Sequence, residues 1–304
     1  MRDVVADILD KTEMTADELA ERLERARDLA YWRTLSTDLS VDGNEPAPAS
    51  VATDTELRTA VAQFRTDRYF QTPPLLAATT LGSLNRAIDV VTAAGWPAVF
   101  ALVYDGLWHC ARQPAIGHVL ESHFGAGYSQ IPHVWIHVVP PVSGAVGWMP
   151  HFDGFRQARV SVWVALTDAT VDNGCIHIVP PDVLPPAFRT TDLETRLTMS
   201  DVLKAMHGTH ALPVSAGAAV GWEFDVFHWG GRAVNPRGAR RSMSMEFLAA
   251  GQAPEADETP LIGVEGPLPA FEERLRVVAI GLRAYAKREA ASRRYRVLAD
   301  RLLA

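Results

Sequence analysis

Two strand-like segments joined by a tight turn limit what the middle of this chain can form. In residues 159–167, RVSVWVALT, apolar side chains occupy every second position, as in a strand with one face in a hydrophobic core. Asn173-Gly174 is a turn of the kind that joins antiparallel strands, and the apolar run CIHIV follows it. The sequence therefore predicts an antiparallel β core.

Further strands are predicted on both sides of this pair. In residues 132–140, PHVWIHVVP, the two histidines and the tryptophan share one face and the aliphatic side chains share the other. Similar segments occur at 217–228 and 241–249, and the apolar run 99–104 is predicted to be a buried strand. Together these segments predict a fold that is mainly β with flanking helices.

Helical spacing of apolar residues dominates both ends of the chain. The predicted helices span residues 15–35, 54–67, 75–94, 116–124 and 271–303. A connection with its own helical segment links Pro180 to Gly208, long enough to form a lid. We expect a single domain over residues 1–304, with an N-terminal helical region (1–95), a β core (96–251) and a C-terminal helical tail (252–304).

Composition favours small-molecule partners. The formal net charge is −7, which argues against binding to nucleic acid or to a membrane surface, because both require a positive field. We interpret the arginines of the C-terminal helix as its solvated face. The two cysteines, Cys110 and Cys175, are too few for a disulfide scaffold, and no signal segment or long apolar run is evident. We therefore expect a cytoplasmic protein.

A histidine and an aspartate two residues apart, His151 and Asp153, precede the central strand pair. This spacing directs both side chains to the same side of an extended segment, as two ligands of one metal ion require. His228, at the end of a predicted strand, is the best candidate for a third ligand. Two histidines and one carboxylate form the facial triad of non-haem Fe(II) oxygenases, whereas a structural zinc site uses four protein ligands. The alternative is a surface histidine beside a loop aspartate.

Taken together, these motifs resemble the phytanoyl-CoA dioxygenase family of Fe(II)/2-oxoglutarate oxygenases. The resemblance covers about residues 147–247 and rests on HFD at 151–153, the stretch WVALTDATVDNGCIHIVP from Trp163, and H-x₆-N-x₅-R from His228 to Arg241. It implies a double-stranded β-helix core of the jelly-roll, cupin-like type. It also implies that His151, Asp153 and His228 bind iron.

The resemblance further implies a pocket for 2-oxoglutarate. Arg241 would pair with the distal carboxylate of 2-oxoglutarate, since a guanidinium matches a carboxylate in bidentate fashion, and Trp163 would line the pocket. Arg240 is the competitor, because neighbouring residues of a strand point to opposite faces. His137 is predicted to face the same pocket. The segment after His228 departs from the family pattern: it reads HWGGRAVN, two residues longer than usual and without its serine.

We therefore predict a dioxygenase that uses Fe(II), 2-oxoglutarate and O₂ to hydroxylate an unactivated C–H bond, releasing succinate and CO₂. The carboxylate of Asp153 favours oxygen insertion, since halogenases of the family carry a small residue there. Candidate substrates are free amino acids and natural-product intermediates of secondary metabolism. Two alternatives stay open: a metal-dependent cupin-type isomerase or hydrolase on the same fold that does not use 2-oxoglutarate, and a binding or regulatory protein without turnover.

Overall fold

Two antiparallel sheets lie at the centre of the protein. The computed structural model describes residues 14–44, 47–156, 158–189, 197–285 and 290–304; the N-terminal segment 1–13 and part of the predicted lid, 190–196, lie outside this description. The five-stranded sheet has the order β1 (Tyr69–Pro74), β6 (Ala218–Glu223), β3 (Arg159–Ala165), β8 (Arg240–Leu248) and β2 (Ser129–Val139). The three-stranded sheet has the order β5 (His210–Leu212), β4 (Ile176–Val179) and β7 (Phe227–Gly230).

Helices surround this core and contain more of the described residues than the strands do. The α-helices are α2 (Ala16–Arg27), α3 (Leu29–Leu35), α4 (Asp54–Asp67), α5 (Ala78–Ala93), α6 (Asp105–Ala111), α7 (Pro114–Phe124), α8 (Met199–His207), α9 (Phe271–Tyr285), α10 (Ala290–Arg293) and α11 (Arg296–Leu303). Short 3₁₀ helices are η1 (Ala98–Val103), η2 (Pro186–Phe188) and η3 (Ala256–Glu258). The prediction of a mainly β fold is therefore corrected to a mixed α/β fold.

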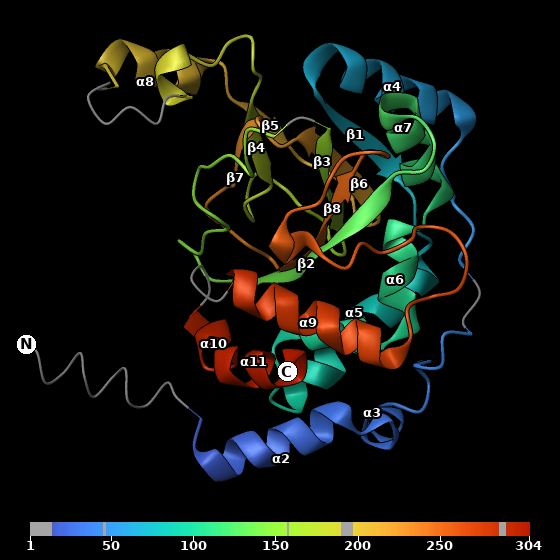
Figure 1. Cartoon of the computed structure of the whole chain (residues 1–304). Coiled ribbons are helices and arrows are strands. Elements are labelled where there is room, and N and C mark those ends of the chain that lie inside the picture. The colour runs from blue at the N-terminus through green and yellow to red at the C-terminus, as the bar shows by residue number, and fades with distance from the viewer. Residues whose placement is uncertain (1–13, 45–46, 157, 190–196, 286–289) are drawn as a thin grey trace, which may run out of the picture.

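The helices cover one face of the large sheet, and the small sheet covers the other. Helix α9 packs on β2 and on η1, while α4 packs on β1 (Figure 1). The β3 side chains Val160, Val162 and Val164 belong to the large core shared with these helices. Trp163 and Ala165 point the opposite way and pack with residues of β4 and β6 in a second cluster between the sheets. The alternation predicted from the sequence is thus confirmed.

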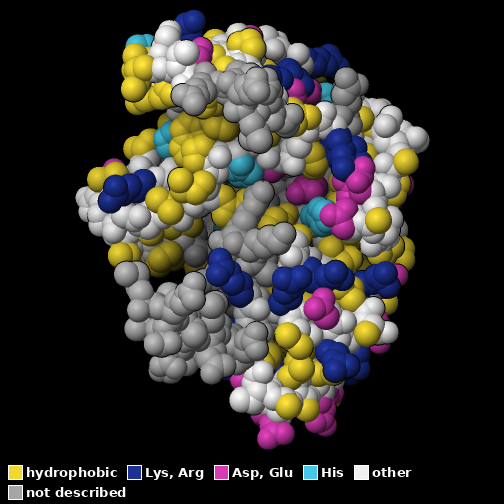
Figure 2. All heavy atoms as spheres, turned by 60° about the vertical axis from the view of Figure 1, so that its left-hand side comes forward, with side chains coloured by type: hydrophobic (Ala, Val, Ile, Leu, Met, Phe, Trp, Pro, Cys, Tyr) yellow, Lys and Arg dark blue, Asp and Glu magenta, His cyan; other side chains and the backbone are white. Residues whose placement is uncertain are grey.

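Helix α8 lies beyond the three-stranded sheet (Figure 1), where its Ala205 packs with Val179 of β4 and with Leu184. Thr198 caps its N-terminus, as its hydroxyl accepts a hydrogen bond from the backbone N–H of Asp201. Three of its apolar side chains, Met199, Leu203 and Met206, are exposed, and hydrophobic side chains gather at the top of the face in Figure 2. The connection after Pro180 therefore carries a helix, as predicted.

Two predicted strands differ in the structure. The run 99–104 was predicted to be a buried strand; it is buried but forms η1, because an unbroken apolar run carries no period that distinguishes strand from helix. The predicted strand 217–228 is interrupted by a turn, in which Val226 N donates to Glu223 O at 3.0 Å. Its two halves, β6 and β7, therefore lie in different sheets.

The terminal segments also differ in detail. The predicted helix 15–35 is divided at Asp28, whose carboxylate accepts a hydrogen bond from Ala30 N and caps α3. The predicted helix 271–303 comprises α9, α10 and α11. Strand β1 lies within the region 1–95 that was expected to be helical, and it pairs with β6 at the edge of the sheet. Among the described residues, no helix is long and apolar enough to cross a membrane.

Candidate metal centre

Backbone pairing brings the HFD segment against strand β7. His151 and His228 form an isolated antiparallel bridge in which each backbone N–H donates to the other's carbonyl at 3.0 Å. This pairing places the two imidazole rings 4.3 Å apart between centroids. Asp153 N donates to Phe224 O at 3.1 Å, which holds the end of the segment at the β6–β7 turn. His151 and His228, 77 positions apart in the chain, are thus fixed side by side by main-chain hydrogen bonds.

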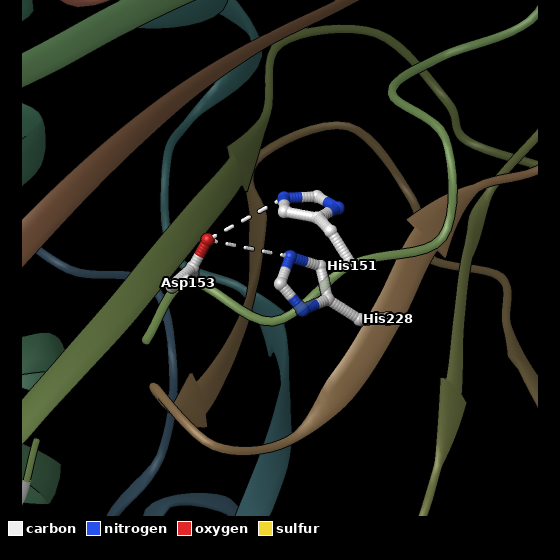
Figure 3. Close-up of side chains that lie close together, drawn as sticks. All are labelled: His151, Asp153 and His228. Carbon is white, nitrogen blue, oxygen red and sulfur yellow. Dashed lines mark ion pairs between the residues drawn. The ribbon is translucent and has the colours of Figure 1, made fainter. Parts of the chain in front are cut away.

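The side chains of His151, Asp153 and His228 converge. One potential ligand atom from each residue lies within 4.8 Å of the other two. Asp153 Oδ1 is 3.5 Å from His151 Nε2 and 3.7 Å from His228 Nε2. Figure 3 shows both imidazoles directed at the same carboxylate oxygen. The structure therefore brings together the three residues that the sequence singled out.

Hydrogen bonds orient both imidazole rings. Nδ1 of His151 donates to Met149 O at 2.7 Å, and Nδ1 of His228 donates to Val226 O at 3.0 Å. Because a carbonyl can only accept, Nδ1 of each ring carries a proton, and Nε2 is the atom directed toward Asp153. Nε2 of His151 is buried and makes no hydrogen bond to any described residue. Metal-binding histidines in proteins are held in this manner.

Asp153 is held through one of its two carboxylate oxygens. Its Oδ2 accepts hydrogen bonds from Ser161 Oγ at 2.6 Å and from Trp222 Nε1 at 2.9 Å. Burial raises the pKa of Asp153, but His228, His151 and the Ser161 hydroxyl outweigh it and hold that pKa below its ordinary value. The carboxylate is therefore anionic, and Oδ1 remains directed at the imidazoles.

Ser161 and Trp222 were not identified as site residues from the sequence. They lie opposite each other on the adjacent strands β3 and β6, so their common approach to Asp153 depends on the strand pairing. The available signal was the position of Ser161 on the non-aliphatic face of its predicted strand. That face became informative only once the register was known.

A cavity adjoins the three converging side chains. Its wall is formed mainly by aromatic and polar side chains, including His137, Trp148, Trp163, Trp222, Arg240, Glu246 and Tyr285. His137 and Trp163, both predicted to face the cosubstrate, lie on this wall. His137 contacts Ser244 Oγ through Nε2 at 3.2 Å and packs edge-on against Trp148.

Arg240 lines the cavity, and Arg241 does not. The side chain of Arg240 is 2% exposed, and its guanidinium lies 5.6 Å from the centroid of the Trp163 ring. Its Nε and Nη1 atoms make no hydrogen bond within the described structure, and burial lowers its pKa to about 10. Arg241 points to the other face of the sheet, where it hydrogen bonds to Asn85 and Asp89 of α5. The structure thus places the competitor, not the residue preferred from the sequence, beside the cluster.

Two glycines make room for the Arg240 guanidinium. A Cβ atom on Gly147 would lie 2.7 Å from Arg240 Nη2 and 2.8 Å from Gly230 Cα. Gly230 directly follows His228-Trp229, and its N–H donates to Trp148 O at 3.0 Å. The close approach of these two backbones requires glycine at both positions and packs them against the guanidinium.

The other residues weighed from the sequence lie elsewhere. Arg156 is half exposed and pairs with Glu255 at 2.7 Å. The backbone N–H of Asn235 donates to Asp172 O in a loop near Arg241. Cys110 and Cys175 are buried, and burial raises their pKa values to about 12 and about 11. These thiols are small core side chains, as predicted.

The donor set fits a divalent transition metal. Two imidazole nitrogens and one carboxylate oxygen are typical ligands of iron, and three protein ligands leave coordination positions open for exogenous groups. A closed structural site would supply four. The His151 Nε2 atom, buried without a hydrogen bond, has the unmet bonding capacity that a metal would satisfy.

Solved structures share this fold. The non-heme alpha ketoglutarate dependent epimerase SnoN from nogalamycin biosynthesis, in complex with Fe3+, alpha ketoglutarate and nogalamycin RO, superimposes with a TM-score of 0.55 at 20% identity, covering 72% of this chain and 95% of SnoN. The non-heme monooxygenase ThoJ, in its apo form, gives 0.54 at 19% identity over 80% of this chain and 98% of ThoJ. The carbocyclase SnoK gives 0.52 at 19% identity over 72% and 100%.

At these identities the likeness establishes the fold, that of the double-stranded β-helix enzymes dependent on iron and 2-oxoglutarate. No curated protein sequence shows significant similarity to this chain. The sequence profile of the phytanoyl-CoA dioxygenase (PhyH) family matches residues 8–242, which is most of the 304-residue chain. The chain therefore belongs to the phytanoyl-CoA dioxygenase (PhyH) family, within the superfamily of Fe/2-oxoglutarate-dependent oxygenases.

Proposed function

We propose that this protein uses Fe(II), 2-oxoglutarate and O₂ to hydroxylate an unactivated C–H bond of a small molecule, with release of succinate and CO₂. One observation carries the proposal: the convergent ligands and a buried guanidinium without hydrogen-bond partners on its Nε and Nη1 atoms face the same cavity. A metal site alone requires no such cation. A metal site that also binds a dicarboxylate such as 2-oxoglutarate requires a cation to pair with the carboxylate that is not on the metal.

His151, Asp153 and His228 would hold the iron. When bound, Fe(II) with 2-oxoglutarate and O₂ supplies an oxidant that can break an unactivated C–H bond, at the expense of decarboxylating the cosubstrate. The chain's contribution is to fix the three ligands. Main-chain hydrogen bonds set the imidazole orientation, and Ser161 and Trp222 set the carboxylate.

Arg240 would bind the distal carboxylate of 2-oxoglutarate, in the role first assigned to Arg241. Burying a guanidinium without a counter-ion costs free energy, which an anionic ligand would offset. Ser242 lies two residues further along the same face of β8, and its buried Oγ makes no hydrogen bond to a described residue. Its hydroxyl would supply the bond for which the segment after His228 has no serine.

Aromatic side chains would exclude water from the reacting groups. Trp148 packs on Tyr285, with ring centroids 4.8 Å apart, and on His137 at 4.5 Å. Trp163 packs on Arg240 from the other side. These aromatic walls strengthen charge interactions inside the cavity, because fewer water molecules screen them.

The carboxylate of Asp153 favours hydroxylation over halogenation, and the isomerase or hydrolase alternative leaves Arg240 without a ligand. Described relatives of similar fold include an epimerase and a carbocyclase of nogalamycin biosynthesis. For this chain we propose a natural-product intermediate or an amino acid as substrate.

An anaerobic titration tests the proposal. Adding 2-oxoglutarate to the Fe(II)-loaded protein should produce the weak visible charge-transfer band of a bidentate complex, and exposure to air should yield succinate. The variant His228→Ala should give neither. If wild-type protein binds iron and shows no band at saturating 2-oxoglutarate, the proposal is wrong and the alternative without 2-oxoglutarate takes its place.

A further inference from the structure

A second cavity joins the metal centre on the side away from Arg240. The two cavities share four wall residues: Trp148, Asp153, Glu246 and Tyr285. The remaining wall of the second cavity is rich in acidic groups and includes His133, Arg156, Glu255, Asp257 and Glu258. A molecule bound in this second cavity would therefore lie directly beside the Asp153 carboxylate.

Glu246 and Arg240 occupy opposite ends of the same strand face. Side chains of a strand alternate, so the cavity face of β8 carries Arg240, Ser242, Ser244 and Glu246 in turn. Six residues of strand separate the two charged ends by roughly 20 Å between Cα atoms. Glu246 is paired in register with Ser161, the residue that holds Asp153. The metal centre thus lies between a buried cation and a largely buried carboxylate.

The acidic groups of this cavity are not fully neutralised by the chain itself. Glu258 is paired with Arg159 at 2.8 Å, and Glu255 is paired with Arg156 at 2.7 Å. Glu246 and Asp257 share the ring of His133, whose Nδ1 is 3.2 Å from Glu246 Oε2 and whose Nε2 is 3.9 Å from Asp257 Oδ2. A doubly protonated His133 would be shared between the largely buried Glu246 and Asp257, whose side chain is 80% exposed to solvent.

Glu246 is also costly to bury. Burial raises its pKa, although hydrogen bonds from His133 and from the Tyr285 hydroxyl, 3.3 Å away, oppose this. The carboxylate is held in place by residues of β2 and α9, so its position beside the cavity is fixed. Its described contacts are a histidine, shared with Asp257, and the Tyr285 hydroxyl, so this fixed carboxylate can accept a further hydrogen bond from a cationic group that enters the cavity.

We propose that Glu246 binds a cationic amino group of the substrate and so restricts the enzyme to amine-bearing molecules. This names the substrate class of the site and rests on the proposed function. The 2-oxoglutarate dianion is attracted by Arg240 and repelled by Glu246. The Arg240 end of the cavity therefore favours 2-oxoglutarate, and the Glu246 end favours the cationic substrate. Tyr285, which fixes Glu246, lies on α9, beyond the segment 8–242 that matches the family. The selection therefore involves a part of the chain that this match does not cover.

Three probes of equal chain length and different charge test this inference: n-hexylamine, n-hexanol and n-hexanoate. Their binding to Fe(II)-loaded protein is measured anaerobically by saturation-transfer NMR, with and without 2-oxoglutarate. We expect wild-type protein to bind n-hexylamine at least about tenfold more tightly than n-hexanol, with n-hexanoate the weakest. Glu246→Gln should remove this preference and leave n-hexanol binding unchanged, whereas Glu246→Asp should retain part of it. The control Glu255→Gln, at the exposed rim, should change it less than about twofold.

The inference is overturned if n-hexanol or n-hexanoate binds wild-type protein as tightly as n-hexylamine, or if Glu246→Gln keeps the preference. It is also overturned if n-hexylamine does not bind at 10 mM, which is roughly the weakest affinity that such a contact would give. Should Glu246→Gln fail to fold, the wild-type series and Glu246→Asp still decide. The visible band of the 2-oxoglutarate complex is recorded in the same samples. Amine preference without the band would disprove the proposed function alone; the band without amine preference would disprove this inference alone.

Discussion

Arg240 and Arg241 are neighbours on strand β8, yet their guanidinium groups lie on opposite faces of the sheet. Arg240 is buried against Trp163 beside the three candidate metal ligands, whereas Arg241 bonds to Asp89 on the helix-covered side. Because successive strand side chains alternate in direction, only one of the two can reach the cavity. Substituting Arg240 should therefore affect ligand binding in the cavity, whereas substituting Arg241 should not.

Arg240→Ala should raise the dissociation constant of 2-oxoglutarate about a hundredfold or more, since a bidentate charge-assisted pair contributes roughly 3 kcal/mol. Arg241→Ala should change it less than about threefold, because the bonds it loses, to Asn85 and Asp89, lie on the other face of the sheet. Anaerobic titration of the visible band measures both. A larger effect of Arg241→Ala would return the anchoring role to that residue.

Ser161→Ala should weaken metal binding by about 10- to 100-fold while leaving the three ligands in place, because outer hydrogen bonds to metal ligands are worth this much. The lost bond is the 2.6 Å contact to Asp153 Oδ2. Competition with a chromophoric chelator measures the affinity. Ser244→Ala, which removes a hydroxyl that contacts His137 instead, is the matched control. Equal metal affinity of the two variants would show that Ser161 does not position Asp153.

Stability depends on an ion pair far from the site, between Arg274 on α9 and Asp105 on α6. Their side chains are 1% and 0% exposed. Arg274→Met should lower the free energy of unfolding by about 3–5 kcal/mol, because the charge of Asp105 stays buried without the opposite charge of Arg274. The exposed pair of Arg25 with Glu21 is the control, and Arg25→Met should cost less than about 1 kcal/mol. Urea unfolding followed by circular dichroism distinguishes them.

Asp105 also predicts a pH dependence. Burial raises its pKa, but Ser40, Arg274 and the Gly43 N–H outweigh burial and hold that pKa below its ordinary value. A carboxyl with a lowered folded-state pKa stabilises the protein above its unfolded pKa of about 3.9, and this contribution is lost as the pH falls through the folded pKa. The difference in unfolding free energy between wild type and Asp105→Asn should therefore be largest near pH 7 and shrink below about pH 4. A difference independent of pH would contradict this assignment.

Strands β2, β3 and β8 were predictable because they alternate, and β4 because an apolar run follows Asn173-Gly174. That β3 and β4 lie in different sheets, instead of pairing across this turn, was not predicted. The segment at η1 was not, since an unbroken apolar run has no period. The sequence also gave no sign that residues 217–228 turn at Phe224 and pass from one sheet to the other. The share of helix was underestimated because η1 was predicted to be a strand and α6 was not predicted at all.

The three converging ligands were recognisable from their spacing and residue types, but their surroundings were not. Counting from His228 favoured Arg241, yet the lengthened loop after His228 makes such counting unreliable by a single residue, and one residue reverses the face of a strand. Ser161 and Trp222 reach Asp153 from two different strands. Their roles follow from register, which no local pattern encodes.

The three candidate metal ligands are not held by one sheet. His228 lies on β7 of the three-stranded sheet, while the carboxylate of Asp153 is anchored to β3 and β6 of the five-stranded sheet. An ion held by both would act as a cross-link, and its contribution to stability, RT ln(1 + [metal]/Kd), grows with the concentration of a solute. The amount of folded protein would then depend on the iron supply of the cell. A shortage of iron would reduce both the activity of the protein and its folded population.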